Sequence, residues 1–341
     1  MVRSSAIQRP GHTELFRLAA LIPRIVSIAG GVPKKSRFEG AALLLRFGCI
    51  ALAVTPLAAA QQTPAGKTGS QKPVGQEVII VTGTYEPAPL EESDRSVDVV
   101  DISQSPTIFR SWADAFRLDS SVDLRQRAPG TQADLSIRGS SFRQTLVLVD
   151  GFRVNDAQSA HHNLDLPVPF ESIQRIEVLH GSGSTLYGSD ALGGAVNFIT
   201  AAPEASELRF GAAAGNFGTN SQNGSVSYLA KRWSEQVSFT RDFSTGFMAD
   251  RDYRNFASTS ETRFHTPLGL STILLALSDR PFGANQFYGH FNSWERTKGW
   301  FAAASQQIGA DTQLDIGYRR HTDQFILVRD RPQVYENNHV M

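Results

Sequence analysis

The chain has 341 residues, 33 Lys and Arg against 33 Asp and Glu, and a single cysteine. A net charge of zero gives no electrostatic reason to expect a nucleic-acid partner, and one cysteine excludes a disulfide framework and a cysteine-based metal site. The length suffices for two ordinary domains.

The N-terminus has the features of an export signal behind a long extension. A basic stretch at 34–37 precedes an apolar run at 41–54, and alanines at 58–60 supply a small-residue cleavage site. The run is short for a membrane span, and Arg46 interrupts it. We expect residues 1–60 to be a signal peptide with an N-terminal extension; the alternative is a buried helix of the mature protein.

A polar segment at 61–75 is rich in Gly, Gln, Ser and Lys, and we expect a flexible tether there. It leads into an extended, β-prone heptapeptide, Glu77–Gly83 (EVIIVTG). Such a segment can add as a strand to an exposed sheet edge of a partner, where main-chain hydrogen bonds supply the affinity. The alternative is the first internal strand of the domain that follows.

The next segments predict a small mixed α+β domain. Residues 97–102 favour a strand, and residues 111–127 favour helix with a break near Ser121, which could cap a second helix. Strands return at 136–139 and 145–149, and an Asp-Gly turn signal follows.

A long polar loop at 151–169 comes next, and long loops inside compact domains are often functional. One interpretation is contact with a ligand, and the alternative is packing within the loop or hydrogen bonding to a wall of strands. Adjacent histidines point to different sides of an extended chain, so the pair is a weak metal signal and no metal site is expected. The candidate ligand-binding residues are Arg153, Asn155, His161, His162, Asn163 and Asp165.

The stretch at 173–200 contains two apolar runs, 176–179 and 195–199, around a segment of mostly Gly and Ser. Val- and Ile-rich runs separated by glycines predict two strands joined by a tight connection. The sequence contains no GxGxxG, P-loop, GxSxG or HExxH motif, so we expect no catalytic residues, no cofactor and no enzyme activity.

Three motifs in this order resemble the plug domain of TonB-dependent outer-membrane receptors: LSIRG at 135–139, LVLVDG at 146–151, and IQRIEVLHGSGSTLYGSDALGGAVNFIT at 173–200. The resemblance implies a plug domain at 76–203. It also implies localisation in the cell outer membrane, contact with its lipid, and a transported small-molecule ligand such as a siderophore or cobalamin. The implied protein partner is TonB, of the inner-membrane energy-transducing complex, bound to Glu77, Val78, Ile79, Ile80, Val81 and Thr82.

From residue 204 onward, segments of about ten residues alternate between apolar and polar side chains, as in outer-membrane barrels. A soluble antiparallel sandwich would also alternate, but the export signal and the plug-like motifs favour the barrel. The apolar faces are formed by Val237, Phe239 and Phe243; Leu314, Ile316 and Tyr318; Leu208, Phe210 and Ala212; and Val226, Tyr228 and Ala230.

Residues 281–300 are rich in Asn, Gly and aromatic side chains, and we expect a wet loop between strands there. Tyr288 and Trp294 are candidates for ligand contact. The alternative places them in the aromatic belt at the membrane interface or in loop packing.

A plugged transporter barrel has about 22 strands, whereas residues 204–341 accommodate roughly 7 or 8 strands of about ten residues. The expected fold is an α+β plug domain followed by an antiparallel transmembrane β-barrel, apparently incomplete. The expected function is TonB-dependent uptake. The alternatives are a TonB-linked signalling receptor, for whose extra domain the tether is too short, and a truncated, non-functional fragment.

Overall fold

The structure is a computed structural model that describes residues 79, 80, 82–84, 87–102, 111–117, 119–331 and 333–341. All of them lie in one compact unit, Gln71–Met341. The expected signal peptide and tether fall outside the described residues, as do Glu77, Val78 and Val81. No helix in the described part of the chain has the length and hydropathy needed to cross a membrane.

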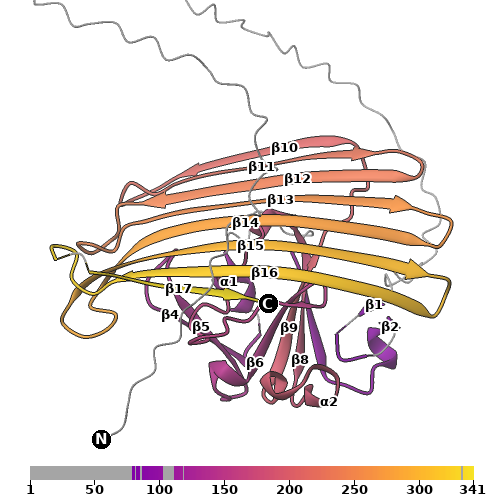
Figure 1. Cartoon of the computed structure of the whole chain (residues 1–341), viewed down its shortest axis with the longest axis horizontal. Helices are drawn as coiled ribbons and strands as arrows, with labels where there is room; N and C mark the ends of the chain where they lie inside the picture. Colours follow the sequence, from indigo (N-terminus) through magenta and orange to yellow (C-terminus); the bar gives the residue numbers. More distant parts are fainter. Residues whose placement is uncertain (1–78, 81, 85–86, 103–110, 118, 332) are drawn as a thin grey trace, which may run out of the picture. The chain divides into compact units, whose positions relative to one another are not determined.

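The N-terminal domain, between Ile79 and Thr200, is built on a five-stranded mixed sheet of order β3-β8-β9-β6-β7 (Figure 1). Neighbours pair antiparallel except β6 and β9, which are parallel. The strands expected around 176–179 and 195–199 are confirmed as β8 and β9. The bounds are β3 Val97–Asp101, β6 Thr145–Val149, β7 Phe152–Arg153, β8 Ile173–His180 and β9 Gly194–Thr200.

Strand β6 explains how this sheet forms a core on both faces. All five of its residues are buried, and alternate side chains of a strand point to opposite faces. Leu146 and Leu148 pack with Leu179, whereas Val147 and Val149 belong to the main core cluster.

Two hairpin strands cover the sheet next to helix α1, Trp112–Phe116. The helix begins as expected after Ser111, whose side chain accepts a hydrogen bond from the backbone N–H of Asp114. The second helix expected after Ser121 is wrong. Residues Val122–Gln126 form β4, because they pair with β5, Ala133–Ile137, and turn Val122 and Leu124 toward the core.

The remaining elements of the N-terminal domain are short. They connect the main strands or, in the case of β1 and β2, form a small separate ladder. Their bounds are β1 Ile79–Ile80, β2 Ala88–Pro89, η1 Leu90–Glu92, η2 Phe142–Gln144, η3 Phe170–Ser172, α2 Ser184–Tyr187 and η4 Ser189–Ala191.

The C-terminal sheet consists of eight antiparallel strands, each paired with the next along the chain (Figure 1). Within the described residues its first and last strands do not pair with each other. The bounds are β10 Glu207–Ala214, β11 Asn220–Leu229, β12 Trp233–Ser244, β13 Tyr253–His265, β14 Leu270–Asn285, β15 Asn292–Ile308, β16 Thr312–Ile326 and β17 Val334–Val340.

The wet loop expected over 281–300 is shorter than predicted, because β14 and β15 extend into it and leave only residues 286–291 between them. Phe282 is buried with Ala128 and Phe287 instead of lying in a loop. Trp294 lies in β15, six residues before Trp300 and on the same face of the strand.

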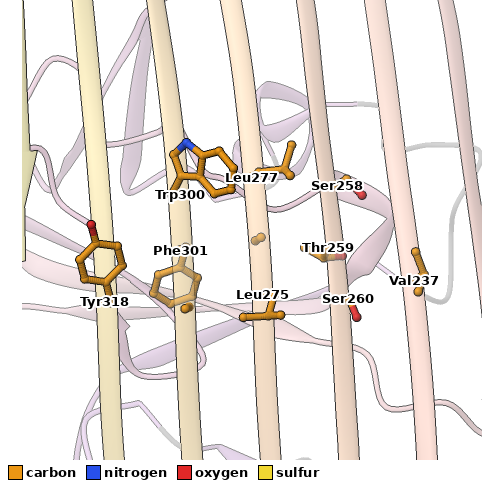
Figure 2. A pocket seen from close by; sticks show the side chains of 11 residues that line it. Val237, Ser258, Thr259, Ser260, Leu275, Leu277, Trp300, Phe301 and Tyr318 are labelled. Atoms are coloured by element: carbon orange, nitrogen blue, oxygen red, sulfur yellow. The ribbon is translucent and has the colours of Figure 1, made fainter. Parts of the chain in front are cut away.

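The two faces of the C-terminal sheet differ in their surroundings. Leu274, Ala276 and Phe301 of its inner face belong to the main core cluster of the N-terminal domain. The side chains between them point the other way and are exposed, so the predicted alternation is confirmed. Figure 2 shows an apolar groove on this outer face, where Val237, Leu275, Leu277, Trp300 and Tyr318 lie along neighbouring strands.

Candidate functional site

The loop after β7 lies between the two sheets, and most of its polar side chains are buried. The domain itself fixes two of them. The Asn155 side chain accepts a hydrogen bond from Val147 N (2.7 Å) and donates one to Thr145 O (3.0 Å). Asn163 accepts from Asp156 N (2.8 Å) and donates to Phe142 O (3.2 Å). The Asn155 amide thus holds the loop backbone against β6, and the Asn163 amide ties the loop to itself and to η2.

Asp156 closes the tip of the loop. Its Oδ2 accepts hydrogen bonds from Ser159 N (2.8 Å), Ser159 Oγ (2.9 Å) and Ala160 N (2.9 Å). Burial would raise the pKa of Asp156, but the hydrogen bonds from Ser159 and the positive charge of His162 lower it below its ordinary value. The loop tip is therefore built around a carboxylate.

Charged side chains of the C-terminal sheet contact this loop directly. Arg280 of β14 lies with Nη1 2.7 Å from Asp165 Oδ1 and 3.2 Å from Leu164 O. Arg319 of β16 is 3 % exposed and donates to Asn155 O at 2.5 Å. The two sheets are thus joined by charges as well as by apolar packing.

His162 lies at the centre of this contact, 4 % exposed. Its Nδ1 is 3.2 Å from Asp165 Oδ2, and its Nε2 is 3.1 Å from Glu295 Oε1 on β15. Burial opposes a charged ring, but the two carboxylates outweigh it and raise the pKa of His162 well above its ordinary value. Asp165 has the opposite shift: burial would raise its pKa, but Arg280 and His162 hold it well below the usual range. An imidazolium flanked by carboxylates follows.

Two further residues of the C-terminal sheet complete the cluster. His321 of β16 lies 3.8 Å from carboxylate oxygens of both Asp156 and Asp165. Tyr288, in the loop between β14 and β15, donates to Glu295 Oε2 at 2.8 Å. We call the whole set, from both sheets, the interface cluster; its members are Asp156, His162, Asp165, Arg280, Tyr288, Glu295, Arg319 and His321.

The interface cluster also offers a possible set of metal ligands. His162, Glu295 and Asp323 each place a ligand atom within 4.8 Å of the others. A cation there would have to replace the proton on Nε2 of a ring whose other nitrogen also faces a carboxylate. The charged ring already neutralises these carboxylates, so an ion pair accounts for the arrangement.

The remaining candidate residues of the loop lie apart from the interface cluster. Arg153 turns toward the α2–η4 segment, where Nη1 is 2.8 Å from Asp190 Oδ2 and Nη2 donates to Tyr187 O. His161 Nδ1 is 2.7 Å from Asp134 Oδ1, and its ring stacks on Phe142. Contact of any of these side chains with a ligand stays a prediction.

Sequence reasoning missed the members from the C-terminal sheet. Four of these side chains lie at strand positions where a charged group must either enter the interior or face the membrane: Arg280, Glu295, Arg319 and His321. Strand periodicity marks such positions as inward-facing, but it does not name their partners.

The described part of the expected TonB-binding segment is docked in the N-terminal domain. β1 pairs with β2, and Ile80 is fully buried. Thr82 N donates to Glu177 Oε2 (2.9 Å), Thr82 Oγ1 accepts from Asn197 Nδ2 (3.0 Å), and Gly83 N donates to Tyr187 Oη (3.1 Å). These contacts agree with the first-strand interpretation; TonB binding by residues 77–82 stays a prediction.

Comparison with known proteins gives the class. Residues 89–195 match the family model "TonB-dependent Receptor Plug Domain". This match, with the antiparallel sheet that follows, identifies a TonB-dependent receptor plug domain joined to part of a barrel. TonB-dependent receptors are non-enzymatic proteins of the outer membrane. The N-terminal domain is the plug domain, and the C-terminal sheet matches part of the barrel.

Two individual relatives are similar to this chain over part of its length. The chain is 32 % identical over 213 residues to "Vitamin B12 transporter BtuB" of Vibrio vulnificus, covering 58 % of this chain and 35 % of the relative. It is 35 % identical over 132 residues to "Iron-regulated outer membrane virulence protein" of Vibrio cholerae, covering 36 % of this chain and 20 % of the relative. The chain spans about a third or less of the length of these relatives.

Solved structures agree on the fold. The ferripyoverdine receptor of the outer membrane of Pseudomonas aeruginosa aligns with a TM-score of 0.58 at 16 % identity, over 77 % of this chain and 40 % of that one. The alcaligin outer-membrane receptor FauA of Bordetella pertussis aligns with a TM-score of 0.57 at 16 % identity, over 73 % and 42 %.

Proposed function

We propose that this chain serves in TonB-dependent uptake of a scarce solute across the outer membrane. The plug domain blocks the barrel at rest, and TonB pulls on residues 77–82 to remodel it. The observation that carries the proposal is the plug domain held against the inner barrel face by the interface cluster. Such a contact holds the plug domain in the pore and keeps the pore sealed. The contact is noncovalent, so it can break when the plug domain is remodelled and form again afterwards.

The substrate class follows from the relatives. A vitamin B12 transporter and an iron-regulated outer-membrane protein are both similar to this chain. We therefore take cobalamin and ferric siderophores as the candidate solutes. They would meet the plug domain at the loop that follows β7 and at Tyr288, while main-chain and side-chain donors there orient the ligand without covalent chemistry.

The pulling step has a defined route through the plug domain. Force applied to residues 77–82 reaches Thr82, which is bonded both to Glu177 of β8 and to Asn197 of β9. These are two central strands of the five-stranded sheet. Because Glu177 is fully buried and accepts from Thr82 N, pulling Thr82 away breaks a hydrogen bond to a buried carboxylate, which destabilises the plug.

The experiment compares cells that produce the receptor from its native gene with and without TonB. Labelled cobalamin and a set of labelled ferric siderophores are offered singly. We expect one class of solute to bind both strains equally and to accumulate only in the strain with TonB. Accumulation independent of TonB, or specific binding of neither class, would contradict the proposal.

A further inference from the structure

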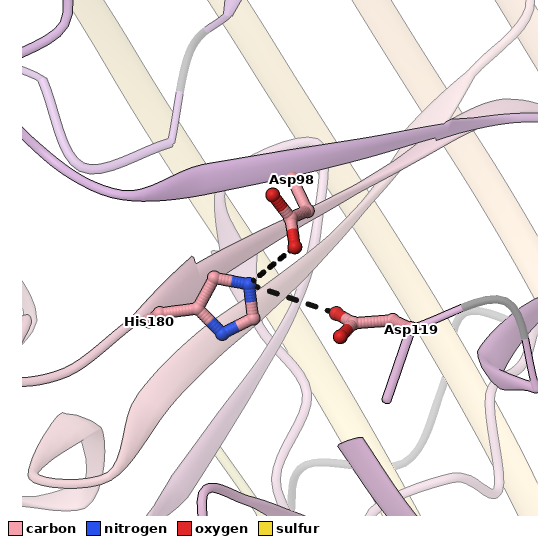
Figure 3. A group of neighbouring side chains, drawn as sticks. All are labelled: Asp98, Asp119 and His180. Carbon is pink, nitrogen blue, oxygen red and sulfur yellow. Dashed lines mark hydrogen bonds and ion pairs between the residues drawn. The ribbon is translucent and has the colours of Figure 1, made fainter. Parts of the chain in front are cut away.

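A second cluster of ligand-type side chains lies in the plug domain, away from the interface cluster. Asp98 belongs to β3, His180 ends β8, and Asp119 lies in the connection from α1 to β4 (Figure 3). Three separate pieces of chain thus bring one side chain each to the same point. We call this group the Asp98–Asp119–His180 cluster.

The geometry centres on one ring nitrogen. His180 Nε2 is 3.0 Å from Asp98 Oδ2 and 3.6 Å from Asp119 Oδ2. Figure 3 shows both carboxylates facing this nitrogen. The side chains of His180 and Asp119 are 1 % and 6 % exposed, whereas that of Asp98 is 61 % exposed. Two ligand atoms are therefore preorganised by burial, and the third reaches solvent, which gives an ion a way in.

The contacts of the other ring nitrogen, Nδ1, show that it carries a hydrogen. Ser121 Oγ lies 2.6 Å from Asp119 Oδ1 and 3.0 Å from His180 Nδ1. A carboxylate only accepts, so the single hydroxyl proton of Ser121 goes to Asp119, and Ser121 Oγ must accept from Nδ1–H. Nε2 then faces the two carboxylates with either a proton or a metal ion, because its bare lone pair would be repelled.

Asp119 supplies an independent sign of a missing partner. Its Oδ2 is buried and has no hydrogen-bond partner, although its Oδ1 is bonded to both the N–H and the hydroxyl of Ser121. In the described part of the chain neither Asp98 nor Asp119 pairs with an arginine or lysine. A buried, half-satisfied carboxylate oxygen aimed at the ring nitrogen is unfavourable unless a positive charge, on a bound ion or on the ring, lies beside it.

The spacing suits one small ion. Zinc binds His nitrogen and carboxylate oxygen at about 2.0–2.2 Å, so two ligands at angles of about 90–110° stand roughly 3.0–3.5 Å apart. The two observed separations, 3.0 and 3.6 Å, come within a tenth of an ångström of that range. The Nδ1–H to Ser121 contact resembles the outer hydrogen bond that metal-binding histidines use to fix their tautomer.

We propose that Asp98, Asp119 and His180 form a binding site for a divalent transition-metal ion, with Zn²⁺ as the fitting ion and water in the open position beside Asp98. One nitrogen and two carboxylate oxygens match the ligand preference of Zn²⁺. The bound ion ties β3, β8 and the α1–β4 connection together, and so braces the edge of the five-stranded sheet. This proposal does not depend on the transported solute.

The test measures Zn²⁺ binding by the full chain in detergent, by competition with a chromogenic chelator. We expect one equivalent to bind tightly, and His180→Ala to weaken binding at least about 100-fold by removing the only nitrogen ligand. The matched control is His290→Ala, which removes an exposed loop histidine and should leave the affinity unchanged. Equal affinity in His180→Ala and the wild type would overturn the proposal.

A second variant and a spectroscopic measurement test the proposal even if His180→Ala folds poorly. Asp98→Asn changes a largely exposed residue and should fold, yet weaken Zn²⁺ binding at least about tenfold because a ligand charge is lost. X-ray absorption of the loaded chain should show one nitrogen and oxygen ligands near about 2.0–2.2 Å. Less than one equivalent bound by the wild type, or unchanged affinity in Asp98→Asn, means that a protonated His180 alone bridges the carboxylates and that the proposal is wrong.

Discussion

Arg280 of barrel strand β14 and Asp165 of the plug domain form an ion pair of 2.7 Å with side chains only 15 % and 6 % exposed. The two residues lie 115 positions apart in the chain. Asp165 also faces the charged ring of His162, so one carboxylate balances a positive group from each domain. This pairing is the specific part of the contact that keeps the plug domain in place.

Asp165→Asn should therefore loosen the plug domain. Removing one partner of a buried pair leaves the other charge uncompensated, which destabilises by about 3–5 kcal/mol. Urea unfolding followed by tryptophan fluorescence measures the change. The matched control, Asp123→Asn, removes a carboxylate whose pair with Arg125 is exposed, and should change stability by less than about 1 kcal/mol. Similar effects of the two substitutions would show that the buried pair is not important.

Glu171 should make the plug–barrel contact sensitive to pH. Burial, with the negative charge of Asp242, raises the pKa of Glu171 from 4.5 to about 7. The folded state thus holds a proton that the unfolded state releases, so stability should fall as the pH rises from about 4.5 to 7. Glu171→Gln should make this slope shallower and stabilise the protein at pH 8. The control is Glu92→Gln on the exposed η1 turn; an unchanged slope in Glu171→Gln would contradict the assignment.

Gly317 marks a close approach between barrel and plug domain. A Cβ at this position would lie 2.8 Å from Phe152 Cδ1, and Phe152 itself packs on Phe301. Gly317→Ala should force a shift that destabilises by about 1–3 kcal/mol. At Gly215 a Cβ would meet only Thr219 at 3.7 Å. Thermal unfolding should separate the two alanine variants, and a neutral Gly317→Ala would show that the sheets are not tightly packed there.

His161 is the loop histidine best placed to meet a solute, since its side chain is 28 % exposed whereas that of His162 is 5 % exposed. His161→Ala should weaken solute binding to whole cells and should lower the unfolding midpoint less than His162→Ala does. His162→Ala should instead destabilise the plug domain, because Asp165 and Glu295 lose the ring between them. Arg143→Ala, an exposed change on η2, serves as control. Unchanged affinity in His161→Ala would make the loop purely structural.

Much of the fold could be predicted because its signals are local. The Val- and Ile-rich runs at 176–179 and 195–199 became β8 and β9, and the alternation around Val237 marked β12. The segment 122–126 was misjudged as helix because its strand character depends on pairing with β5. Short apolar runs do not reveal such tertiary pairing.

Some members of the interface cluster could be predicted from the sequence. The polar loop after β7 is an unusual feature of the sequence and supplies the candidates His162 and Asp165, whereas Tyr288 comes from the segment at 281–300. Arg280 and Glu295 were not named, since their partners lie more than a hundred residues away and no spacing rule connects them. The Asp98–Asp119–His180 cluster could not be predicted either, because its three residues form no motif in the sequence.

The central claim is that TonB acts on residues 77–82 of a docked plug domain, and Val81→Pro tests it most directly. Proline removes a backbone donor and blocks strand pairing with a partner. Binding and uptake of the labelled solute are measured on the same cells, with Gln71→Pro in the tether as control. We expect Val81→Pro to keep wild-type surface binding and lose at least about nine-tenths of uptake, while Gln71→Pro keeps both. Wild-type uptake by Val81→Pro would contradict the account.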